Sequence, residues 1–262
     1  MELASERARI APGQDFWIGV NFSLEPGWHV YWVNPGDSGE PPRVAWKLPP
    51  DFHAGSIRWP RPERITLPSL VDYGYRGSVL LMAPIHVAAM ARTGRLAELG
   101  ADVSWVVCRD VCLPGKAALG ISLPVTQHAE IDATQRTVFE TARRLLPKPA
   151  PTGWTATTRV AGDQFVITVE TGRPIRAARF FPLEGQQISN AAPQRADAFD
   201  HGIRIAVKKA EDLVRMPATL RGVLAFPSGG SYVIDAPIES TTASPRMDVN
   251  PLKASPPKGR NR

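Results

Sequence analysis

Both cysteines of this chain lie in one segment, Val103–Val125, whose pattern is typical of a strand, a tight turn and a second strand. An apolar, β-branched run leads into Cys108, the polar pair Arg109-Asp110 follows, and another alternating run leaves Cys112. Residues that face each other across antiparallel strands have Cα atoms roughly 4.5–5.5 Å apart, and a disulfide needs about 4.4–6.8 Å. The spacing therefore permits a local disulfide across a β-hairpin.

Such a bridge encloses a very short ring. The stabilisation that a disulfide provides by constraining the unfolded chain grows with loop length, so this ring contributes little. A ring this short tends to be strained, and strained, accessible disulfides are the ones that undergo thiol exchange. The short spacing therefore favours a redox role for the two cysteines. An inert staple or two buried thiols is the alternative, and the spacing alone does not decide between them. Arg109 would favour a thiolate on Cys108, whereas Asp110 would oppose it.

The chain before this segment consists of short alternating runs separated by turn residues, in keeping with its 26 prolines and 21 glycines. Phe16–Phe22 and Trp28–Trp32 alternate on either side of Pro26-Gly27, which predicts a hairpin. Val79–Val87 predicts a buried strand. Asp72-Tyr73-Gly74-Tyr75 predicts a loop with two aromatic side chains of the exposed type, which would act as a lid over the disulfide; the alternative is that both tyrosines are ordinary core aromatics.

The pattern changes after Val125. Apolar residues at helical spacing predict a short helix over Asp132–Leu146, capped by Asp132 or Thr134, and a proline-rich linker over Pro147–Pro151. The remaining runs recur at the spacing of a small cysteine-free sandwich, and two of them, Trp154–Val160 and Phe165–Val169, flank Ala161-Gly162-Asp163, which predicts a hairpin. We therefore predict an all-β chain with two β-sandwich domains joined by a short helix and linker. The predicted parts are a first domain (1–127), a helix and linker (128–151), a second domain (152–240) and a disordered basic tail (241–262).

Charge and hydropathy exclude several function classes. Residues 241–262 contain five basic residues and one acidic residue, so this tail carries +4 of the net +6 and the folded part is nearly neutral. That distribution argues against nucleic acid as a partner. No run of about 18 apolar residues is present to span a membrane, and the first residues lack the apolar region of a signal peptide.

Motifs for other chemistry are weak. Gly36-Asp37-Ser38-Gly39 matches the nucleophile string of trypsin-like proteases, but Glu40 replaces the next glycine and only His29 lies upstream, so we interpret it as a turn. The five histidines are scattered and no phosphate-binding glycine loop occurs, so we expect no cofactor and no metal site. The two thiolates could hold Cu(I), which leaves a copper-handling module as an alternative function. An inert interaction protein with a structural disulfide is a third.

Three blocks resemble the N-terminal periplasmic domain of the DsbD family of thiol:disulfide interchange proteins, especially its ScsB branch. They are GWHVYWVNPGDSGEPP (Gly27–Pro42), VDYGYRGSVLL (Val71–Leu81) and VSWVVCRDVCLPGKAAL (Val103–Leu119). The resemblance implies an immunoglobulin-like β-sandwich with an inserted cysteine hairpin beneath a cap loop, and more weakly a second such domain. It also implies a periplasmic module that takes electrons from a membrane-embedded reductase and passes them to oxidised periplasmic proteins.

Residue by residue, the resemblance assigns Cys108 and Cys112 to the redox pair. Cys112 corresponds to the sulfur that forms a mixed disulfide with the partner's thioredoxin-like domain. Asp72, Tyr73, Gly74 and Tyr75 correspond to the cap, so Tyr73→Ala is expected to speed reaction with small reductants. The cysteine spacing is shorter than the enterobacterial pattern, and the chain has no thioredoxin-like domain of its own. We therefore expect a fragment, or a module that relies on separate partners.

Overall fold

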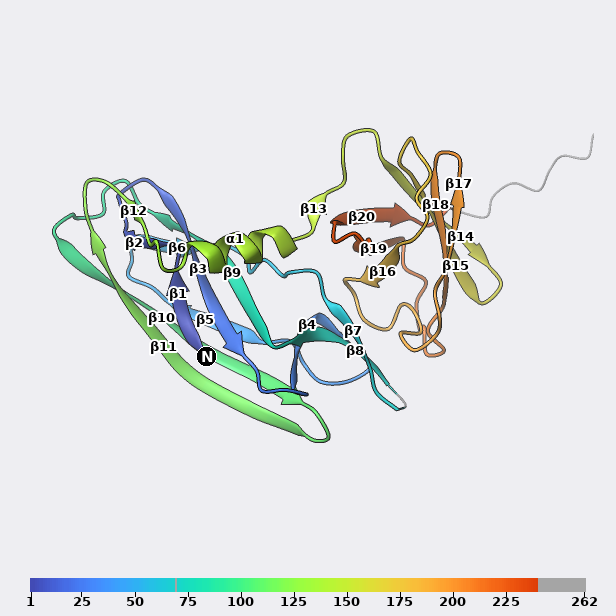
Figure 1. Cartoon of the computed structure of the whole chain (residues 1–262), viewed down its shortest axis with the longest axis horizontal. Helices are drawn as coiled ribbons and strands as arrows, with labels where there is room; N and C mark the ends of the chain where they lie inside the picture. The colour runs from blue at the N-terminus through green and yellow to red at the C-terminus, as the bar shows by residue number, and fades with distance from the viewer. Residues whose placement is uncertain (69, 240–262) are drawn as a thin grey trace, which may run out of the picture.

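The computed structural model describes residues 1–68 and 70–239, and strands make up most of it (Figure 1). Two β-sandwich domains follow each other along the chain, which confirms the predicted fold class. The division at residues 127 and 152 stays a prediction. The expected tail over 241–262 lies outside the described residues.

The first domain is formed by two packed sheets. The sheet that we call the back sheet has the order β1-β3-β9-β6, comprising β1 (Glu2–Ser5), β3 (Asp15–Ser23), β9 (Ser78–Val87) and β6 (Phe52–Ala54). The other, the site sheet, has the order β11-β10-β4-β8-β7, comprising β11 (Cys112–Val125), β10 (Arg95–Cys108), β4 (His29–Gly36), β8 (Val71–Arg76) and β7 (Glu63–Thr66). β5 (Arg43–Lys47) also pairs with β10, and β2 (Arg7–Arg9) pairs with β12 (Glu130–Ile131).

The predicted hairpin between Phe16–Phe22 and Trp28–Trp32 was wrong. β3 pairs with β1 and β9, whereas β4 pairs with β8 and β10, so the chain crosses from one sheet to the other near Pro26-Gly27. Both runs have an apolar face because they line the same core from opposite sides. Alternation reports that a strand is half-buried and does not report which strand lies beside it.

The loop predicted over residues 72–75 is also absent from the fold, because these residues belong to the buried strand β8. Tyr75 faces Val30 of β4 in the register and Gly74 faces Tyr31, so successive β8 side chains point to opposite faces of the site sheet. The side chains of Tyr73 and Tyr75 point into the core, while Asp72 points to the outer face. A Cβ on Gly74 would overlap the Val30 carbonyl oxygen, which explains glycine at this close approach.

The helix α1 (Arg136–Leu145) lies against the back sheet and leads toward the second domain (Figure 1). Phe139 and Ala142 are buried against Leu80 and Met82 of β9. The helix begins later than predicted. Its N-cap residue is Gln135, whose side chain makes no capping hydrogen bond. The Asp132 carboxylate instead accepts hydrogen bonds from Thr134 just before the helix. Within the described part of the chain, no helix has the length and apolar character needed to cross a membrane.

The second domain has its own two sheets and its own apolar core. One has the order β13-β20-β19-β16, comprising β13 (Lys148–Pro149), β20 (Ser231–Pro237), β19 (Thr219–Ala225) and β16 (Arg179–Pro182). The other has the order β14-β15-β18-β17, comprising β14 (Thr155–Ala161), β15 (Gln164–Glu170), β18 (Gly202–Lys208) and β17 (Arg195–Phe199). The hairpin predicted around Ala161-Gly162-Asp163 is present, as β14 and β15.

The two domains share an aromatic contact. Phe181 of β16 packs edge-to-face on Trp32 of β4 and on Tyr73 of β8, with ring centroids 6.4 and 5.2 Å away. Trp32 and Tyr73 are almost fully buried, at 1% exposure each. The second domain therefore closes one end of the first domain's core, directly behind β4 and β8.

Candidate functional site

A disulfide joins Cys108 and Cys112 at the tip of the β10–β11 hairpin. The two residues face each other in the register, with Cα atoms 4.1 Å apart. Cys108 is only 2% exposed, whereas Cys112 is exposed to solvent. Of the two bonded cysteines, Cys112 is therefore the one open to solvent.

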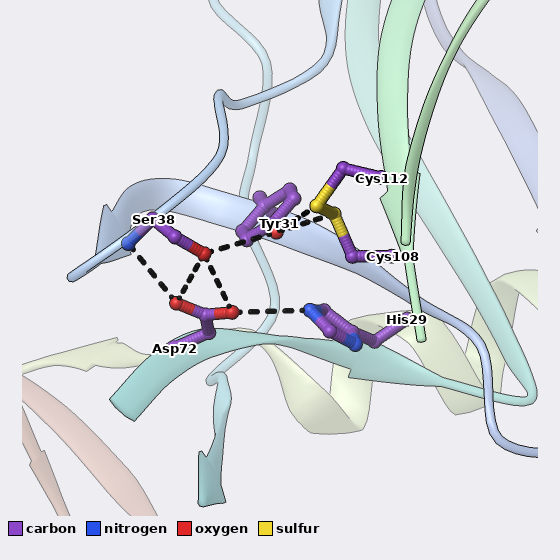
Figure 2. The surroundings of a disulfide bond; sticks show 6 residues. All are labelled: His29, Tyr31, Ser38, Asp72, Cys108 and Cys112. Atoms are coloured by element: carbon purple, nitrogen blue, oxygen red, sulfur yellow. Dashed lines mark hydrogen bonds and ion pairs between the residues drawn. A yellow bond between two sulfur atoms is a disulfide. The ribbon is translucent and has the colours of Figure 1, made fainter. Parts of the chain in front are cut away.

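The disulfide lies on the outer face of the site sheet, and Tyr31 of β4 lies beside it (Figure 2). Cys108 faces His29 in the register, and Tyr31 is two residues further along the same strand, so all three side chains share this face. The Tyr31 hydroxyl donates to Cys108 Sγ at 2.8 Å and lies 3.8 Å from Cys112 Sγ. The phenol thus contacts the bridge from its buried side.

A chain of polar groups continues from Tyr31 into the sheet (Figure 2). Ser38 Oγ lies 3.3 Å from the Tyr31 hydroxyl oxygen and donates to Asp72 Oδ1 at 2.9 Å, and the Ser38 N–H donates to the same oxygen at 3.1 Å. Asp72 Oδ2 lies 3.3 Å from His29 Nε2. Asp72 and His29 are 0% and 1% exposed, so the carboxylate is desolvated and held by these partners.

Residues 36–40, which we call the cover turn, lie over Tyr31. Gly36 and Gly39 both have positive φ, at 92° and 68°. A Cβ on Gly39 would overlap the Tyr31 ring, and one on Gly36 would overlap the Val71 carbonyl oxygen. The two glycines therefore let the backbone pack directly on the phenol and on β8, which keeps solvent from the Tyr31 ring.

The surroundings of Tyr31 keep its hydroxyl protonated. Burial raises the pKa of Tyr31 above its ordinary value, and the negative charge of Asp72 raises it further, while the hydrogen bond to Ser38 opposes them. Tyr31 is therefore a hydrogen-bond donor toward sulfur throughout the neutral range.

The same geometry excludes protease chemistry at Gly36-Asp37-Ser38-Gly39. In a Ser-His-Asp triad the histidine lies between serine and carboxylate. Here Asp72 lies between Ser38 and His29, so the serine donates to a carboxylate and has no base. No group of three or more His, Cys, Asp or Glu side chains in the described residues is placed to hold a metal ion.

The structure brings some of the predicted site residues together and separates others. Cys108 and Cys112 are bonded, and Asp72 reaches them through Ser38 and Tyr31. Tyr73 and Tyr75 lie on the opposite face of the sheet, where burial raises the pKa of both hydroxyls and Tyr75 donates to the Pro60 carbonyl oxygen. They face the core because they alternate with Asp72 and Gly74.

Sequence reasoning missed His29, Tyr31 and Ser38. The alternation in His29–Trp32 already placed His29 and Tyr31 on one face of a strand, opposite the apolar Val30 and Trp32. The sequence pattern did not reveal that β4 pairs with β10, and this pairing brings that face of β4 next to the cysteines.

Apolar and cationic residues lie at the hairpin tip that carries Cys112. Val111 and Leu113 on either side of Cys112 are 60% and 49% exposed. The Arg109 guanidinium lies over the Trp28 ring, 5.1 Å from its centroid. A pocket of about 330 Å³ beside the tip is lined by Phe22, Leu24, Trp28, Trp105, Val107 and Leu113, among others.

Comparison with curated proteins finds no matching sequence. Among solved structures, the chain is similar to the N-terminal periplasmic domain of ScsB from Proteus mirabilis, with 17% identity and a TM-score of 0.66 over 90% of this chain and 91% of that chain. The major pilin subunit BcpA of Bacillus cereus matches with 8% identity and a TM-score of 0.29 over 92% of this chain and 67% of that one. The E. coli chaperone DraB matches with 9% identity and a TM-score of 0.23 over 91% and 97%. Of these three structures, the ScsB domain alone has a TM-score above 0.5, and at 17% identity the likeness establishes the fold and no more.

The family comparison covers the part of the chain that carries the disulfide. Residues 2–122 match the model of the family described as thiol:disulfide interchange protein DsbD, N-terminal. That range includes the back sheet, the site sheet except the last residues of β11, the cover turn and both cysteines. Over residues 2–122 the first sandwich is therefore similar to the DsbD N-terminal family.

Proposed function

We propose that this chain is a thiol–disulfide exchange module that works through Cys108 and Cys112. The observation that carries the proposal is the asymmetry of the bridge: one cysteine is exposed, and the other is buried with a phenol donating to its sulfur. An exposed sulfur accepts nucleophilic attack, and a stabilised buried sulfur is a good leaving group. A purely structural staple needs neither feature.

Reduction would take place in two balanced steps. A partner thiolate attacks Cys112 Sγ, the Cys108–Cys112 bond breaks, and Cys108 leaves as a thiolate that accepts the Tyr31 hydrogen bond. The second thiolate of the partner then attacks the mixed disulfide and releases Cys112, so the partner is oxidised and this module gains two electrons. In the reverse sense, the Cys112 thiolate attacks a substrate disulfide and Cys108 resolves the mixed species.

The proposed partners follow from the family. The electron donor would be a membrane-embedded reductase of the DsbD or ScsB type, or its thioredoxin-like domain, and the acceptors would be oxidised periplasmic thiol proteins. The periplasmic location is supported by the family and by the likeness to a periplasmic domain of ScsB. The exposed apolar residues around Cys112 would contact the partner.

The test is a redox titration of the folded protein. Equilibration with dithiothreitol buffers, followed by alkylation and mass measurement, should reveal two thiols appearing together at a potential above about −300 mV, the range of exchanging disulfides. The reduced protein should then reduce, or be reoxidised by, a thioredoxin-fold protein. A bridge that stays intact in folded protein under dithiothreitol would contradict the proposal, and tight Cu(I) binding without exchange would favour the copper alternative.

Tyr31→Phe is expected to slow reduction by dithiothreitol about tenfold, because the departing Cys108 thiolate loses a hydrogen bond worth ~1.5 kcal/mol. The pKa of Tyr31 is raised, so its hydroxyl stays a donor and the ratio of the two rates should be constant between about pH 7 and about pH 9. Stopped-flow rates across this range provide the check. A ratio near one would remove Tyr31 from the reaction.

A further inference from the structure

A side chain of the second domain holds the cover turn. Asn190 Nδ2 donates to Asp37 Oδ1 at 2.8 Å, and the other oxygen of Asp37 accepts from the Val71 N–H at 2.8 Å. Asn190 is itself 8% exposed, so its amide is fixed by its surroundings. The Asp37 carboxylate is thus bonded on one side to the start of β8 and on the other to the second domain.

Further contacts fix both partners of this bond. Asn34 Nδ2 donates to the Pro182 carbonyl oxygen of the second domain at 2.8 Å, and its Oδ1 accepts from the Gly36 N–H at 3.1 Å. The Arg64 guanidinium donates to the carbonyl oxygens of Asn190 and Ala191, at 3.3 and 3.1 Å. Asn34, two residues before the cover turn, is therefore bound directly to the second domain.

The contacts continue without a gap from this bond to the disulfide. Asp37 precedes Ser38, whose hydroxyl lies 3.3 Å from the Tyr31 hydroxyl oxygen, and Gly39 packs on the Tyr31 ring. Tyr31 in turn donates to Cys108 Sγ. A shift of the cover turn would release the ring on which the position of that hydroxyl depends.

We infer that Asn190 is a positioning residue for the redox site, and that the second domain serves to hold Tyr31 against Cys108 through Asp37 and the cover turn. This inference rests on the proposed function and assigns a role to a domain that has no cysteine. It also explains why the domains meet behind β4 and β8, the strands that bear Tyr31 and Asp72.

Asn190→Ala is expected to slow the reduction of the disulfide by dithiothreitol about fivefold, less than Tyr31→Phe, because the phenol is loosened and not removed. In a Tyr31→Phe background the same substitution should have no further effect, because there is no hydroxyl left to position. An equal slowing in both backgrounds, or none in either, would overturn the inference.

Two further variants separate positioning from damage to the fold. Asn21→Ala removes an amide-to-carboxylate bond, to Glu2, on the back sheet and not on the sheet that carries the site, and should leave the rate unchanged. Asn190→Asp alone sets two carboxylates against each other and should slow the reaction. Combined with Asp37→Asn it restores one amide and one carboxylate, and the amide oxygen introduced at position 37 can still accept from the Val71 N–H, so most of the rate should be recovered. Failure of this exchanged pair to recover, with folding intact by circular dichroism, would count against the inference.

The experiment distinguishes this inference from the proposed function. Dithiothreitol reports the chemistry of the bridge and needs no protein partner. If the Asn190 effect is present but no thioredoxin-fold protein exchanges with the module, the proposed function fails and the positioning role stands. If the wild-type protein exchanges normally and Asn190→Ala behaves like Asn21→Ala, the positioning role fails alone.

Discussion

Cys108→Ser is expected to accumulate a stable mixed disulfide through Cys112, whereas Cys112→Ser should abolish exchange. The difference follows from exposure, because Cys112 is exposed to solvent and Cys108 is buried beneath Tyr31. Without Cys108 the mixed species cannot be resolved from within the module. Without Cys112 the remaining thiol is out of reach of a protein partner.

Non-reducing electrophoresis and mass spectrometry of the trapped species measure this outcome. The bait is a thioredoxin-fold protein that keeps only its nucleophilic cysteine, held as a mixed disulfide with a small thiol, so that the Cys112 thiolate attacks the bait sulfur and the small thiol leaves. The double variant lacking both sulfurs is the control for non-specific capture. Equal trapping by the two single variants would mean that the burial of Cys108 does not govern the reaction. The same trap, applied to a periplasmic extract, would identify the donor and acceptors.

Tyr73→Ala is expected to lower the free energy of unfolding by about 3–5 kcal/mol, the cost of removing a large aromatic side chain from a packed core. Tyr73 is 1% exposed and packs on both Trp32 and Phe181, so the cavity would open where the two domains meet. Urea unfolding followed by circular dichroism measures the loss. Tyr232→Ala is a matched control, because Tyr232 is only partly buried on the second domain and its removal should cost less.

The same variant, Tyr73→Ala, tests whether Tyr73 is a lid over the disulfide. A lid residue would be expected to shield the disulfide, and its removal would speed reaction with small reductants. Tyr73 lies on the face of β8 that points away from the sulfurs, so the rate with dithiothreitol, measured on folded protein, should not rise. A clear acceleration would restore the lid and contradict the assignment of covering to residues 36–40.

Much of the fold was predictable because it depends on neighbours in the sequence. Alternation and turn residues indicated the strands now seen as β3, β9, β14 and β15, and the cysteine hairpin was predicted as β10 and β11. The site was predicted only in part. His29, Tyr31, Ser38 and Asp72 come from segments up to 43 residues apart, and no local pattern connects them.

The sequence by itself determined that Cys108 and Cys112 face each other, since a short antiparallel hairpin brings its two ends together whatever surrounds it. Only the tertiary structure decided what covers them. The pairing of β4 between β10 and β8 placed Tyr31 at the sulfurs and turned Tyr73 toward the core, and the second domain bound the cover turn. The physical reason is that alternation gives each strand two faces, while the choice of neighbouring strand, and so of which face meets which partner, depends on contacts between residues distant in the chain.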